Sequence, residues 1–494
     1  MRAGWPGWAQ TGAAFGLGAV MASGQAPLGL WWLALPALAA LILLICRAQS
    51  WGQAAWLGLF GGTGHFVLAL SWLVQPFLID AETYAWMAPF AVLLMSAGLS
   101  LFWAAATALG WRLASGPRRP LAIALTLTLA EFLRGHILTG FPWALIGHVW
   151  IGLPPAQAAS LFGPTGLTLM TLLITALPVA FRAKGLAASA AIMAAAFGFG
   201  LWRLDQPMPS DRPITLRLAQ PDAEQRMKWD PEMANLYFRR LLDFSGLDPR
   251  PDLVIWPETS VPYLLERNPE LAGIIAEAGQ GATIVIGVQR EDGPRFYNGL
   301  TVIAPDGSIP ARYDKHHLVP FGEYIPFGDL AYNLFGLSAF ASRQGNGYSA
   351  GPGPQVLDLG SRLGRVLPLI CYEAVFPQDL LNAPTRADWI LQITNDGWFG
   401  TLTGPYQHLA QARLRAIEQG LPLIRVANTG VSAVIDAKGR ILASLPLGVA
   451  DIIDTALPAA LPPTPYAKFG EVPALLMLAA LGVALVAIRP RRTT

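Results

Sequence analysis

The sequence predicts a helical membrane region joined to a large layered α/β domain, and three observations carry this prediction. Hydrophobic residues make up 53% of the 494 residues and charged residues only 13%, well below the roughly 25% charged residues usual in soluble proteins. All but four of the 32 acidic residues fall within residues 203–470. Long uncharged stretches precede and follow that block. We therefore expect a membrane domain at 1–203, a water-soluble domain at 204–470, and a last membrane helix with a basic tail at 471–494.

Eight stretches have the apolar character of membrane spans, each of which needs about 20 predominantly apolar residues. No charge occurs between Ala3 and Cys46, and GQAP at 24–27 divides this segment into two spans. The other six lie at 48–79, 83–111, 120–135, 156–181, 185–202 and 472–488. Any one of them could be a buried core helix, but a chain of this size cannot bury them all. We expect eight spans.

Basic residues in the short loops predict the orientation, since cytoplasmic loops carry an excess of Lys and Arg. With the N-terminus in the cytoplasm, ten basic residues fall inside and only Arg134 falls in a short outer loop. The ten are Arg2, Arg47, Arg112, Arg118, Arg119, Arg182, Lys184, Arg489, Arg491 and Arg492. The N-terminus has one Arg and runs into a long apolar pair, which is not typical of a cleaved signal peptide. We expect both termini in the cytoplasm and residues 204–470 on the other side of the membrane.

The water-soluble block alternates β-forming runs with helical patterns, which favours a layered α/β domain. Several of the strands are almost continuously apolar, as in a sheet covered on both faces. The expected strands lie at 213–220, 252–258, 282–289, 299–305, 365–373 and 388–396, followed by 423–430 and a hairpin at 431–443. The expected helices lie at 230–244, 268–278 and 405–420. Residues 326–354 fit neither pattern, and their Leu, Phe and Gly content predicts a mobile apolar flap.

Three classes of ligand are not indicated by the sequence. No basic stripe with interleaved aromatics is present, so nucleic acid is not an expected partner. The Gly clusters lack a phosphate-loop lysine, and no His-x-x-x-His or Cys-x-x-Cys spacing occurs, which argues against a nucleotide or a metal. We expect no cofactor.

Three short motifs each place a polar group at or soon after the end of an apolar run. They are DLVIWPETSVP with Glu258, YDKHHLVPFGEYIPF with Lys315 and Glu323, and LICYEAVFP with Cys371. The only other cysteine is Cys46, so a thiol in an exported domain would have no disulfide partner there. Such a thiol is either a small buried hydrophobe or a nucleophile.

Taken singly, each motif has an ordinary structural explanation. Glu258 could be a carboxylate at a helix N-terminus, Lys315 a solvated turn residue, and Glu373 a surface acid. The rings of His316 and His317 could pair with the thiol, or could simply pack at the base of their loop.

Together the motifs resemble the nitrilase (carbon–nitrogen hydrolase) superfamily, whose members share a Glu after a strand, a Lys in a loop and a Cys at a strand–helix elbow. The match covers most of residues 213–445 in the family's order. With seven spans before the domain and one after, the chain resembles the apolipoprotein N-acyltransferase family from end to end. KWDP at 228–231, WPE at 256–258, HLVPFGEYIPF at 317–327, CYE at 371–373 and NDGWFG at 395–400 are all similar to that family's motifs. The resemblance implies a nitrilase-like αββα sandwich.

The resemblance also implies roles for individual residues. Cys371 would be the nucleophile, with a pKa lowered by the nearby Lys315. Lys315 would also stabilise the tetrahedral oxyanion, together with a backbone N–H near Tyr372. Glu258 would be the general base. Supporting roles follow for four more residues: Glu323 and Glu373 as acids that hold the lysine and shape the charge of the site, and Asn298 and Tyr372 as orienting groups. Trp229, in KWDP, is a candidate wall of the substrate site.

The resemblance implies a two-step acyltransferase. Cys371 would take an acyl chain from a phospholipid as a thioester, and the α-amine of a diacylglyceryl-modified N-terminal cysteine of an apolipoprotein would then accept it. The expected partners are therefore the phospholipid donor, the apolipoprotein acceptor and membrane lipid, and we expect a monomer. The alternatives are a membrane-tethered amide hydrolase and a transporter with an exported sensor domain. A transporter would need polar groups deep in its spans, for which His65, Gln75 and Glu131 are the few candidates.

Overall fold

The computed structural model describes residues 5–325 and 347–487, and the chain divides into two compact units. The first unit is helical and gathers residues 1–207, 402–418 and 463–494. The second contains the sheets and comprises residues 208–401 and 419–462. Most of the flap expected at 326–354 falls on residues 326–346, which lie outside the described residues.

The first unit has a helix in each stretch where a span is expected. Its longer helices are α1 (Trp8–Ala22), α2 (Trp31–Cys46), α3 (Trp51–Ala69), α6 (Ala88–Leu113), α7 (Arg119–Arg134), α8 (Ala159–Asp205), α14 (Gly404–Gln419) and α16 (Val472–Ala487). Shorter elements complete it: η1 (Ser71–Val74), α4 (Gln75–Ile79), α5 (Ala81–Tyr84), η2 (Ala85–Met87), η3 (Gly116–Arg118), η4 (Ile146–Trp150), η5 (Pro154–Ala158) and α15 (Pro465–Phe469).

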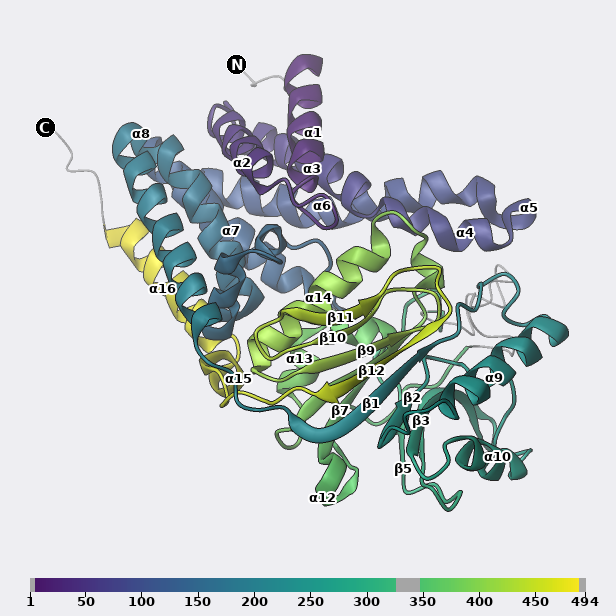
Figure 1. The fold of residues 1–494 in the computed structure, drawn as a ribbon. Helices are drawn as coiled ribbons and strands as arrows, with labels where there is room; N and C mark the ends of the chain where they lie inside the picture. Colours follow the sequence, from purple (N-terminus) through teal and green to yellow (C-terminus); the bar gives the residue numbers. More distant parts are fainter. Residues whose placement is uncertain (1–4, 326–346, 488–494) are drawn as a thin grey trace, which may run out of the picture. The chain divides into compact units, whose positions relative to one another are not determined.

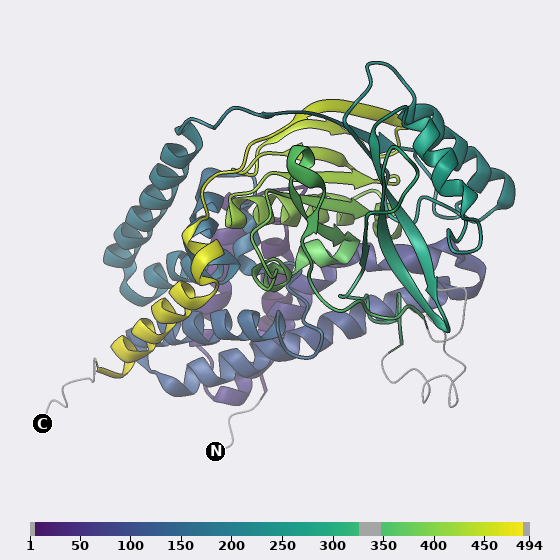
Figure 2. The same ribbon diagram turned by 90° about the horizontal axis from the view of Figure 1, so that it is seen from below.

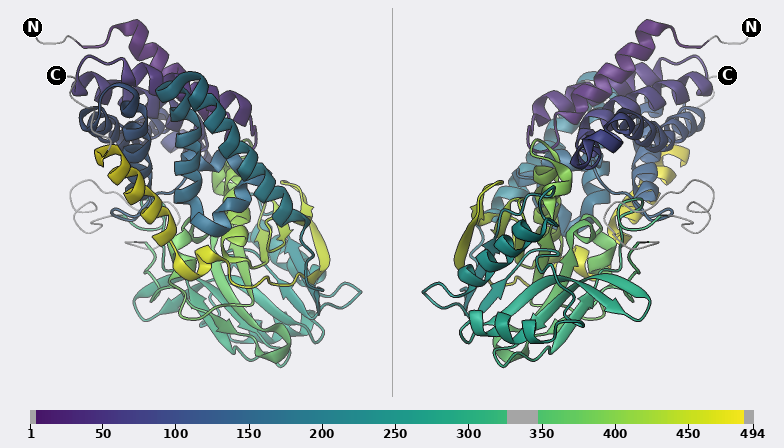
Figure 3. Two further views of the ribbon diagram at one scale, coloured as in Figure 1. Left: turned by 90° about the vertical axis from the view of Figure 1, so that its left-hand side faces the viewer. Right: turned by 90° about the vertical axis from the view of Figure 1, so that its right-hand side faces the viewer.

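The segment named α8 is two helices joined at Arg182, whose φ of 53° and ψ of −125° are not helical. The two helices lie side by side and antiparallel (Figures 1 and 3). Ser189 donates a hydrogen bond from its Oγ to the carbonyl of Ile174 at 2.7 Å, which ties one helix to the other. The break at Arg182 coincides with the loop expected between 156–181 and 185–202.

Fewer helices than expected are long enough to cross a membrane. In the described part of the chain, two segments have the length and apolar character of a span, Ala81–Leu113 and Pro154–Asp205. A third is possible if α3 and Ser71–Ile79, which are bent by 64° to one another, form one span. Helices α1, α2 and α16 have only 15 or 16 residues each, against the roughly 20 that a span needs. The membrane region is therefore clear, and the number eight stays a prediction.

Arg134 does not lie in an outer loop as expected. It is the last residue of α7, is 2% exposed, and forms an ion pair with Glu131 at 2.9 Å. Trp103 donates its indole N–H to the same carboxylate at 2.8 Å. Pairing makes it possible to bury an Arg and a Glu in an apolar helical unit, and a loop assignment from charge alone misses this.

The second unit contains two six-stranded sheets, in agreement with the expected sandwich. One sheet has the order β12-β1-β2-β3-β4-β5 and the other β11-β10-β9-β8-β7-β6. The first is formed by β1 (Arg212–Gln220), β2 (Leu253–Ile255), β3 (Thr283–Asp292), β4 (Arg295–Ile303), β5 (Ala311–Asp314) and β12 (Asp451–Leu457). The second is formed by β6 (Leu357–Asp358), β7 (Arg365–Ile370), β8 (Trp389–Thr394), β9 (Leu423–Ala427), β10 (Ser432–Ile435) and β11 (Ile441–Leu445). Because β1 contacts β9 and β4 contacts β7, the sheets pack face to face.

Each sheet has a parallel centre. Strands β1, β2 and β3 run parallel in one sheet, and β7, β8 and β9 in the other, with antiparallel strands at the edges. The central strands are buried along almost their whole length, for example Val366–Ile370 of β7 and all of β8. This explains their continuous apolar sequences. The short elements between the strands are α12 (Gly360–Leu363), η6 (Cys371–Val375), α13 (Pro377–Leu381) and η7 (Asp396–Phe399).

Two helices, α9 (Pro231–Ser245) and α10 (Glu270–Ala278), pack on the outer face of the first sheet and lie side by side (Figures 1 and 2). The start of α9 is fixed locally, because Asp230 caps two free amides and Pro231 occupies the first turn. Its apolar stripe, which includes Phe238 and Leu241, contributes to a core with Val254 and Ile284 of the sheet.

Candidate functional site

The candidate site lies in the second unit, where residues that follow the parallel strands meet. Glu258 comes three residues after β2, Cys371 directly after β7, and Asn428 directly after β9. Parallel strands present the groups at their carboxyl ends on one edge, which is where sites form in such sheets. Asn428 donates its amide to the main-chain carbonyl of Glu258 at 2.7 Å, which joins the two sheets at this edge.

Glu258 is buried, with 5% of its surface exposed, and only one of its carboxylate oxygens is occupied. Oε1 accepts a hydrogen bond from Asn298 at 2.6 Å, whereas Oε2 has no hydrogen-bond partner among the described residues. Burial raises the pKa of Glu258, and the nearby Glu323 adds to the rise, although Lys315 opposes it. A carboxylate with a raised pKa and a free oxygen is suited to accept a proton.

The backbone around Glu258 needs a glycine on the neighbouring strand. A Cβ on Gly287 of β3 would lie 2.3 Å from the carbonyl oxygen of Pro257 and 2.6 Å from the Cα of Glu258. Thr259 has a φ of +45°, a conformation that residues other than glycine rarely adopt. The turn that carries Glu258 is therefore held tightly against β3.

Lys315 follows β5 and is bound by two carboxylates. Its Nζ lies 2.9 Å from both oxygens of Glu323 and 3.7 Å from Oε1 of Glu258. Asn298 of β4 donates its side-chain amide to Glu258 and to Glu323, and its carbonyl accepts the backbone N–H of Lys315 at 2.8 Å. Burial opposes the charged form of Lys315, but Glu323 and Glu258 outweigh burial and raise its pKa. The lysine is a fixed ammonium group.

Cys371 is the first residue after β7, and its backbone is strained. It has a φ of +52°, and 5% of its surface is exposed. Burial raises the pKa of the thiol, and so does Glu258; Lys315 lowers it by less. The expectation that Lys315 makes Cys371 a thiolate is therefore wrong for the free protein, because burial outweighs the cation. The charges of Glu258 and Lys315 both affect the pKa of Cys371, and the catalytic roles of the three residues stay predictions.

Glu373 joins the two segments that carry Lys315 and Cys371. Its Oε1 accepts the backbone N–H groups of His316 and His317 at 2.9 and 3.2 Å and the hydroxyl of Tyr313 at 2.7 Å. Its Oε2 accepts the N–H of Ile370 at 2.7 Å. Glu373 is fully buried, so it is not the surface acid that its sequence position allowed.

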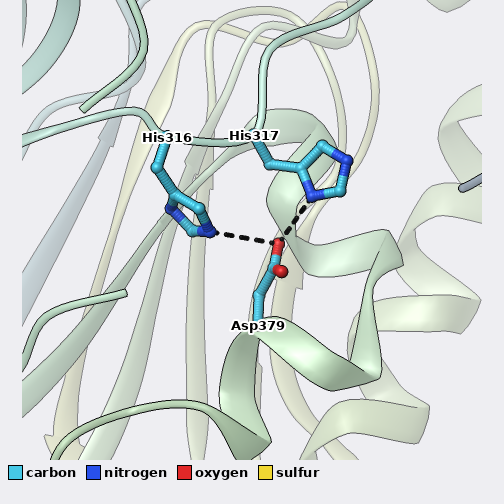
Figure 4. A group of neighbouring side chains, drawn as sticks. All are labelled: His316, His317 and Asp379. Carbon is cyan, nitrogen blue, oxygen red and sulfur yellow. Dashed lines mark hydrogen bonds and ion pairs between the residues drawn. The ribbon is translucent and has the colours of Figure 1, made fainter. Parts of the chain in front are cut away.

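The two histidines next to Lys315 point at Asp379 (Figure 4). His317 Nδ1 lies 3.1 Å and His316 Nε2 3.5 Å from the Asp379 carboxylate. Burial opposes the charged form of His316, but Asp379 and Glu373 outweigh it and raise its pKa to about 10. The ring of His317 stacks on Phe376 with centroids 3.5 Å apart. Both rings thus pack at the base of the loop.

One atom from each of His316, His317 and Asp379 could contribute to a metal site, since these atoms lie within 4.8 Å of one another. A metal ligand must give up its proton, whereas His316 is held in its protonated form between two carboxylates. We interpret the group as a network of ion pairs. The expectation that the protein uses no metal stays a prediction.

The other two predicted residues lie near these groups. The ring of Tyr372 packs edge-on against Phe376 and His317, with centroids 4.8 and 5.8 Å apart. Trp229 lines a small pocket together with Lys228, Tyr237 and Asn428, among others. The role of Tyr372 as an orienting group near the oxyanion and the role of Trp229 in substrate binding stay predictions.

The sequence analysis missed two residues of the site. Asn428 directly follows the expected strand that begins at Leu423, which is apolar except for Arg425, so the rule that selected Glu258 and Cys371 would have found it. Lys228 is 5% exposed and donates to the carbonyl of Glu258 at 3.1 Å and to the hydroxyl of Thr259 at 2.6 Å. It lies in the KWDP motif, where only Trp229 was selected.

Comparison with known proteins divides the chain in the same way. Residues 17–177 match the family model of the apolipoprotein N-acyltransferase N-terminal domain. Residues 247–463 match the model of the carbon–nitrogen hydrolase family. Among solved structures, the chain is similar to a CN-hydrolase superfamily protein from Xanthomonas campestris, with 20% identity and a TM-score of 0.37 over 58% of this chain and all of that one. That score is too low to support an argument.

The curated relatives match along nearly the whole chain. An apolipoprotein N-acyltransferase of Bradyrhizobium diazoefficiens is 41% identical, over 98% of this chain and 96% of that protein. Those of Brucella melitensis and Caulobacter vibrioides are 37% and 38% identical, over 98% and 88% of this chain and 97% and 86% of theirs. On this evidence the chain is a member of the apolipoprotein N-acyltransferase family.

Proposed function

We propose that this protein transfers an acyl chain from a phospholipid to the N-terminal α-amine of diacylglyceryl-cysteine in apolipoproteins, through a thioester on Cys371. Family membership supports the acceptor class and the reaction, because the relatives are named apolipoprotein N-acyltransferases. The observation that supports the mechanism is the contact of a buried ammonium, Lys315, with a buried carboxylate, Glu258, whose Oε2 is free, together with the effect of both charges on the pKa of Cys371.

In the first step, Glu258 takes the proton of the Cys371 thiol as the sulfur attacks the ester carbonyl of the phospholipid. The C–S bond forms, and the carbonyl oxygen becomes an oxyanion that Lys315 stabilises. When the C–O bond to the lysophospholipid breaks, Glu258 returns the proton to the leaving oxygen. Burial of the thiol keeps it neutral until this proton acceptor is used.

In the second step, the α-amine of the apolipoprotein attacks the thioester. Glu258 accepts a proton from the amine as the C–N bond forms, and Lys315 again stabilises the oxyanion. The C–S bond then breaks, and the proton returns to the Cys371 sulfur. Glu258, Lys315 and Cys371 are buried, and exclusion of water from the reaction would favour the amine over hydrolysis.

The membrane unit supports a lipid substrate. We propose that its helices cross the inner membrane eight times with both termini in the cytoplasm, so that the catalytic unit faces the periplasm. Attachment at both ends would hold Cys371 near the headgroup plane and replace a search in solution by positioning. The buried acid expected as a transport group, Glu131, binds Arg134 and Trp103 instead, which weakens the transporter alternative.

Detection of the acyl group bound to Cys371 tests the proposed function. Purified protein is incubated with a phospholipid labelled in its acyl chains, and protein-bound label is measured before and after hydroxylamine, which cleaves thioesters. We expect hydroxylamine-sensitive label that a diacylglyceryl-cysteine peptide removes as N-acylated product. Cys371→Ser protein should retain no such label, because no thioester can form.

Cys46→Ser is the matched control, since these two are the only cysteines of the chain. It should label as well as the parent protein. Equal labelling of Cys371→Ser and the parent would overturn the mechanism. Absence of label from phospholipid, together with release of ammonia from small amides, would instead support the amide hydrolase.

A further inference from the structure

Lys228 is a buried cation next to the candidate catalytic groups. Its Nζ is held by the carbonyl of Glu258 and the hydroxyl of Thr259, both uncharged acceptors. Among residues 5–325 and 347–487, no carboxylate oxygen lies within ion-pair distance of this ammonium. Burial of an ammonium without a carboxylate partner is costly. A general packing role is therefore a poor explanation for Lys228.

The contacts of Lys228 concentrate on the strained turn. Thr259 has a φ of +45° and gives Lys228 its shortest hydrogen bond, 2.6 Å. The Glu258 carbonyl that Lys228 binds also accepts the amide of Asn428. A strained backbone conformation persists only where surrounding contacts hold it in place, and such conformations concentrate at functional sites. Lys228 and Asn428 together fix the position of the proposed base.

The charges of the site balance only when Lys228 is counted. Glu258 and Glu323 are two carboxylates, and both share the single ammonium of Lys315. One cation and two anions leave a net negative charge in a buried place. When the Cys371 proton moves to Glu258, the negative charge passes from that carboxylate to the sulfur, and the net charge of the site stays the same. A second ammonium makes the sum zero before and after the proton transfer.

We propose that Lys228 is a second cation of the acyl-transfer site, which positions Glu258 and stabilises the negative charge that moves onto the Cys371 sulfur. This role deepens the function proposed above and rests on it. The proton passes from the thiol to Glu258 and later to the leaving oxygen, so Lys228 itself neither gains nor loses one.

The electrostatics of the described residues fit this role. Burial lowers the pKa of Lys228 to about 7, and Glu258 and Cys371 are the groups that oppose this fall. Tyr237 is the other titratable residue that lines the same pocket, and burial raises its pKa, so it stays neutral near pH 7. Lys228 is therefore charged below about pH 7 and increasingly neutral above it, and its effect on the thiol should follow the same course.

The reactivity of Cys371 toward methyl methanethiosulfonate, a small thiol reagent, tests this coupling. In the Cys46→Ser protein the modification of Cys371 is followed by mass spectrometry from pH 5.5 to 9. Lys228→Gln keeps a hydrogen-bond donor and removes the charge. At pH 6 we expect it to react more slowly than its parent by about tenfold, the effect of one unit in the thiol pKa. At pH 9 the two rates should converge, because the parent lysine is then mostly neutral.

Two more variants separate charge from structure. Lys228→Arg keeps the charge and should retain the parent rate at pH 6. Thr259→Val keeps the ammonium of Lys228 but removes one of its hydrogen-bond acceptors. The pKa of Lys228 should therefore fall, and the pH at which the rate of Cys371 modification changes should fall with it. Thermal unfolding of each variant shows whether it is folded. If Lys228→Gln does not fold, an unmoved profile in Thr259→Val overturns the proposal.

An unchanged profile in folded Lys228→Gln protein would likewise overturn the role of Lys228. The reagent needs neither lipid nor lipoprotein, so this result is independent of the proposed function. If Cys371 takes the acyl label but the pH profile of its modification is unchanged in Lys228→Gln, only the role of Lys228 is contradicted. If the reactivity of Cys371 depends on Lys228 but Cys371 takes no acyl label, only the proposed acyl transfer is contradicted.

Discussion

At the scale of single residues, the site is organised around a thiol that is neutral at rest. An adjacent cation lowers a thiol pKa, but at Cys371 burial and the charge of Glu258 act in the opposite direction and prevail. The same burial raises the pKa of Glu258 and makes it a stronger base. Reactivity at Cys371 therefore depends on a proton acceptor placed within reach.

The sequence could identify Glu258 and Cys371 because each follows a run of β-forming residues, a pattern visible in one dimension, and Lys315 because its motif resembles that of a known family. Lys228 could not be found in this way. Its contacts run to a main-chain carbonyl and to Thr259, and neither is visible in a pattern of side chains. The sign of the Cys371 shift was missed because burial, unlike a neighbouring charge, depends on the whole fold.

The ion pairs of His316 predict a pH-dependent contribution to stability. The folded protein raises its pKa from 6.5 to about 10. The contribution is therefore complete below about pH 6.5 and is lost as the pH rises through 10. It should amount to a few kcal/mol, on the order expected for such a shift. We expect His316→Gln to melt several degrees below the parent at pH 6 and close to it at pH 10.

Thermal unfolding in detergent from pH 6 to 10 measures the difference in melting temperature between His316→Gln and the parent. The comparison is between variant and parent, because Lys228, whose folded pKa lies below its usual value, changes stability in the opposite direction over the same range. His136→Gln alters an exposed ring and should leave the profile unchanged. If this difference in melting temperature were the same at every pH, the pH-dependent contribution of the His316 ion pairs would be contradicted.

At the scale of elements, strands with strong apolar runs and helices with a clear stripe were predictable. Strands β1, β3, β7 and β8 and helix α9 lie where the sequence analysis expected them. Three strands were missed: β5, β6 and β12. The first two have only four and two residues, too few for a periodic pattern. The third is an edge strand with exposed acids at 451 and 454, so its sequence is typical of a loop.

Strand β3 controls the position of the Glu258 turn through Gly287. In Gly287→Ala the new Cβ would lie 2.3 Å from a carbonyl oxygen of that turn, so the turn must shift. A displacement of about 1 Å can cost on the order of 100-fold in rate. We expect acyl-enzyme formation to fall by about this factor, as measured by the rate of labelling from phospholipid.

Gly273→Ala is the matched control on α10, where a Cβ would meet no atom within 4 Å. It should label at the parent rate and gain roughly 0.5–1 kcal/mol in stability, as expected for Ala in place of Gly within a helix. If Gly287→Ala also labelled at the parent rate, the Glu258 turn would not need its close approach to β3.

At the scale of the whole molecule, the chain joins a helical membrane unit to a hydrolase-like unit. Composition and charge placement were enough to predict this division. The number of spans was not settled in the same way, because apolar length in sequence does not reveal where a helix bends or ends. The bend of 64° after α3 and the reversal at Arg182 are examples.

Labelling of introduced cysteines tests the proposed orientation. Both target positions, Ser115 and Arg250, are exposed, and the Cys46→Ser background removes the partly buried thiol of Cys46. A maleimide that cannot cross the membrane should label Arg250→Cys in spheroplasts. It should label Ser115→Cys only after the membrane is opened. The reverse pattern would place the catalytic unit in the cytoplasm and exclude the proposed reaction.

The carboxylate of Glu373 links the strand that ends in Cys371 to the loop that carries Lys315, which precedes it by more than fifty positions. During biosynthesis, a chain that has emerged only as far as the lysine has no acceptor for the amides of that loop. A chain that includes Cys371 but in which Glu373 has not yet bound that loop would carry an inert sulfhydryl, so competence for chemistry should arise only when these hydrogen bonds have formed.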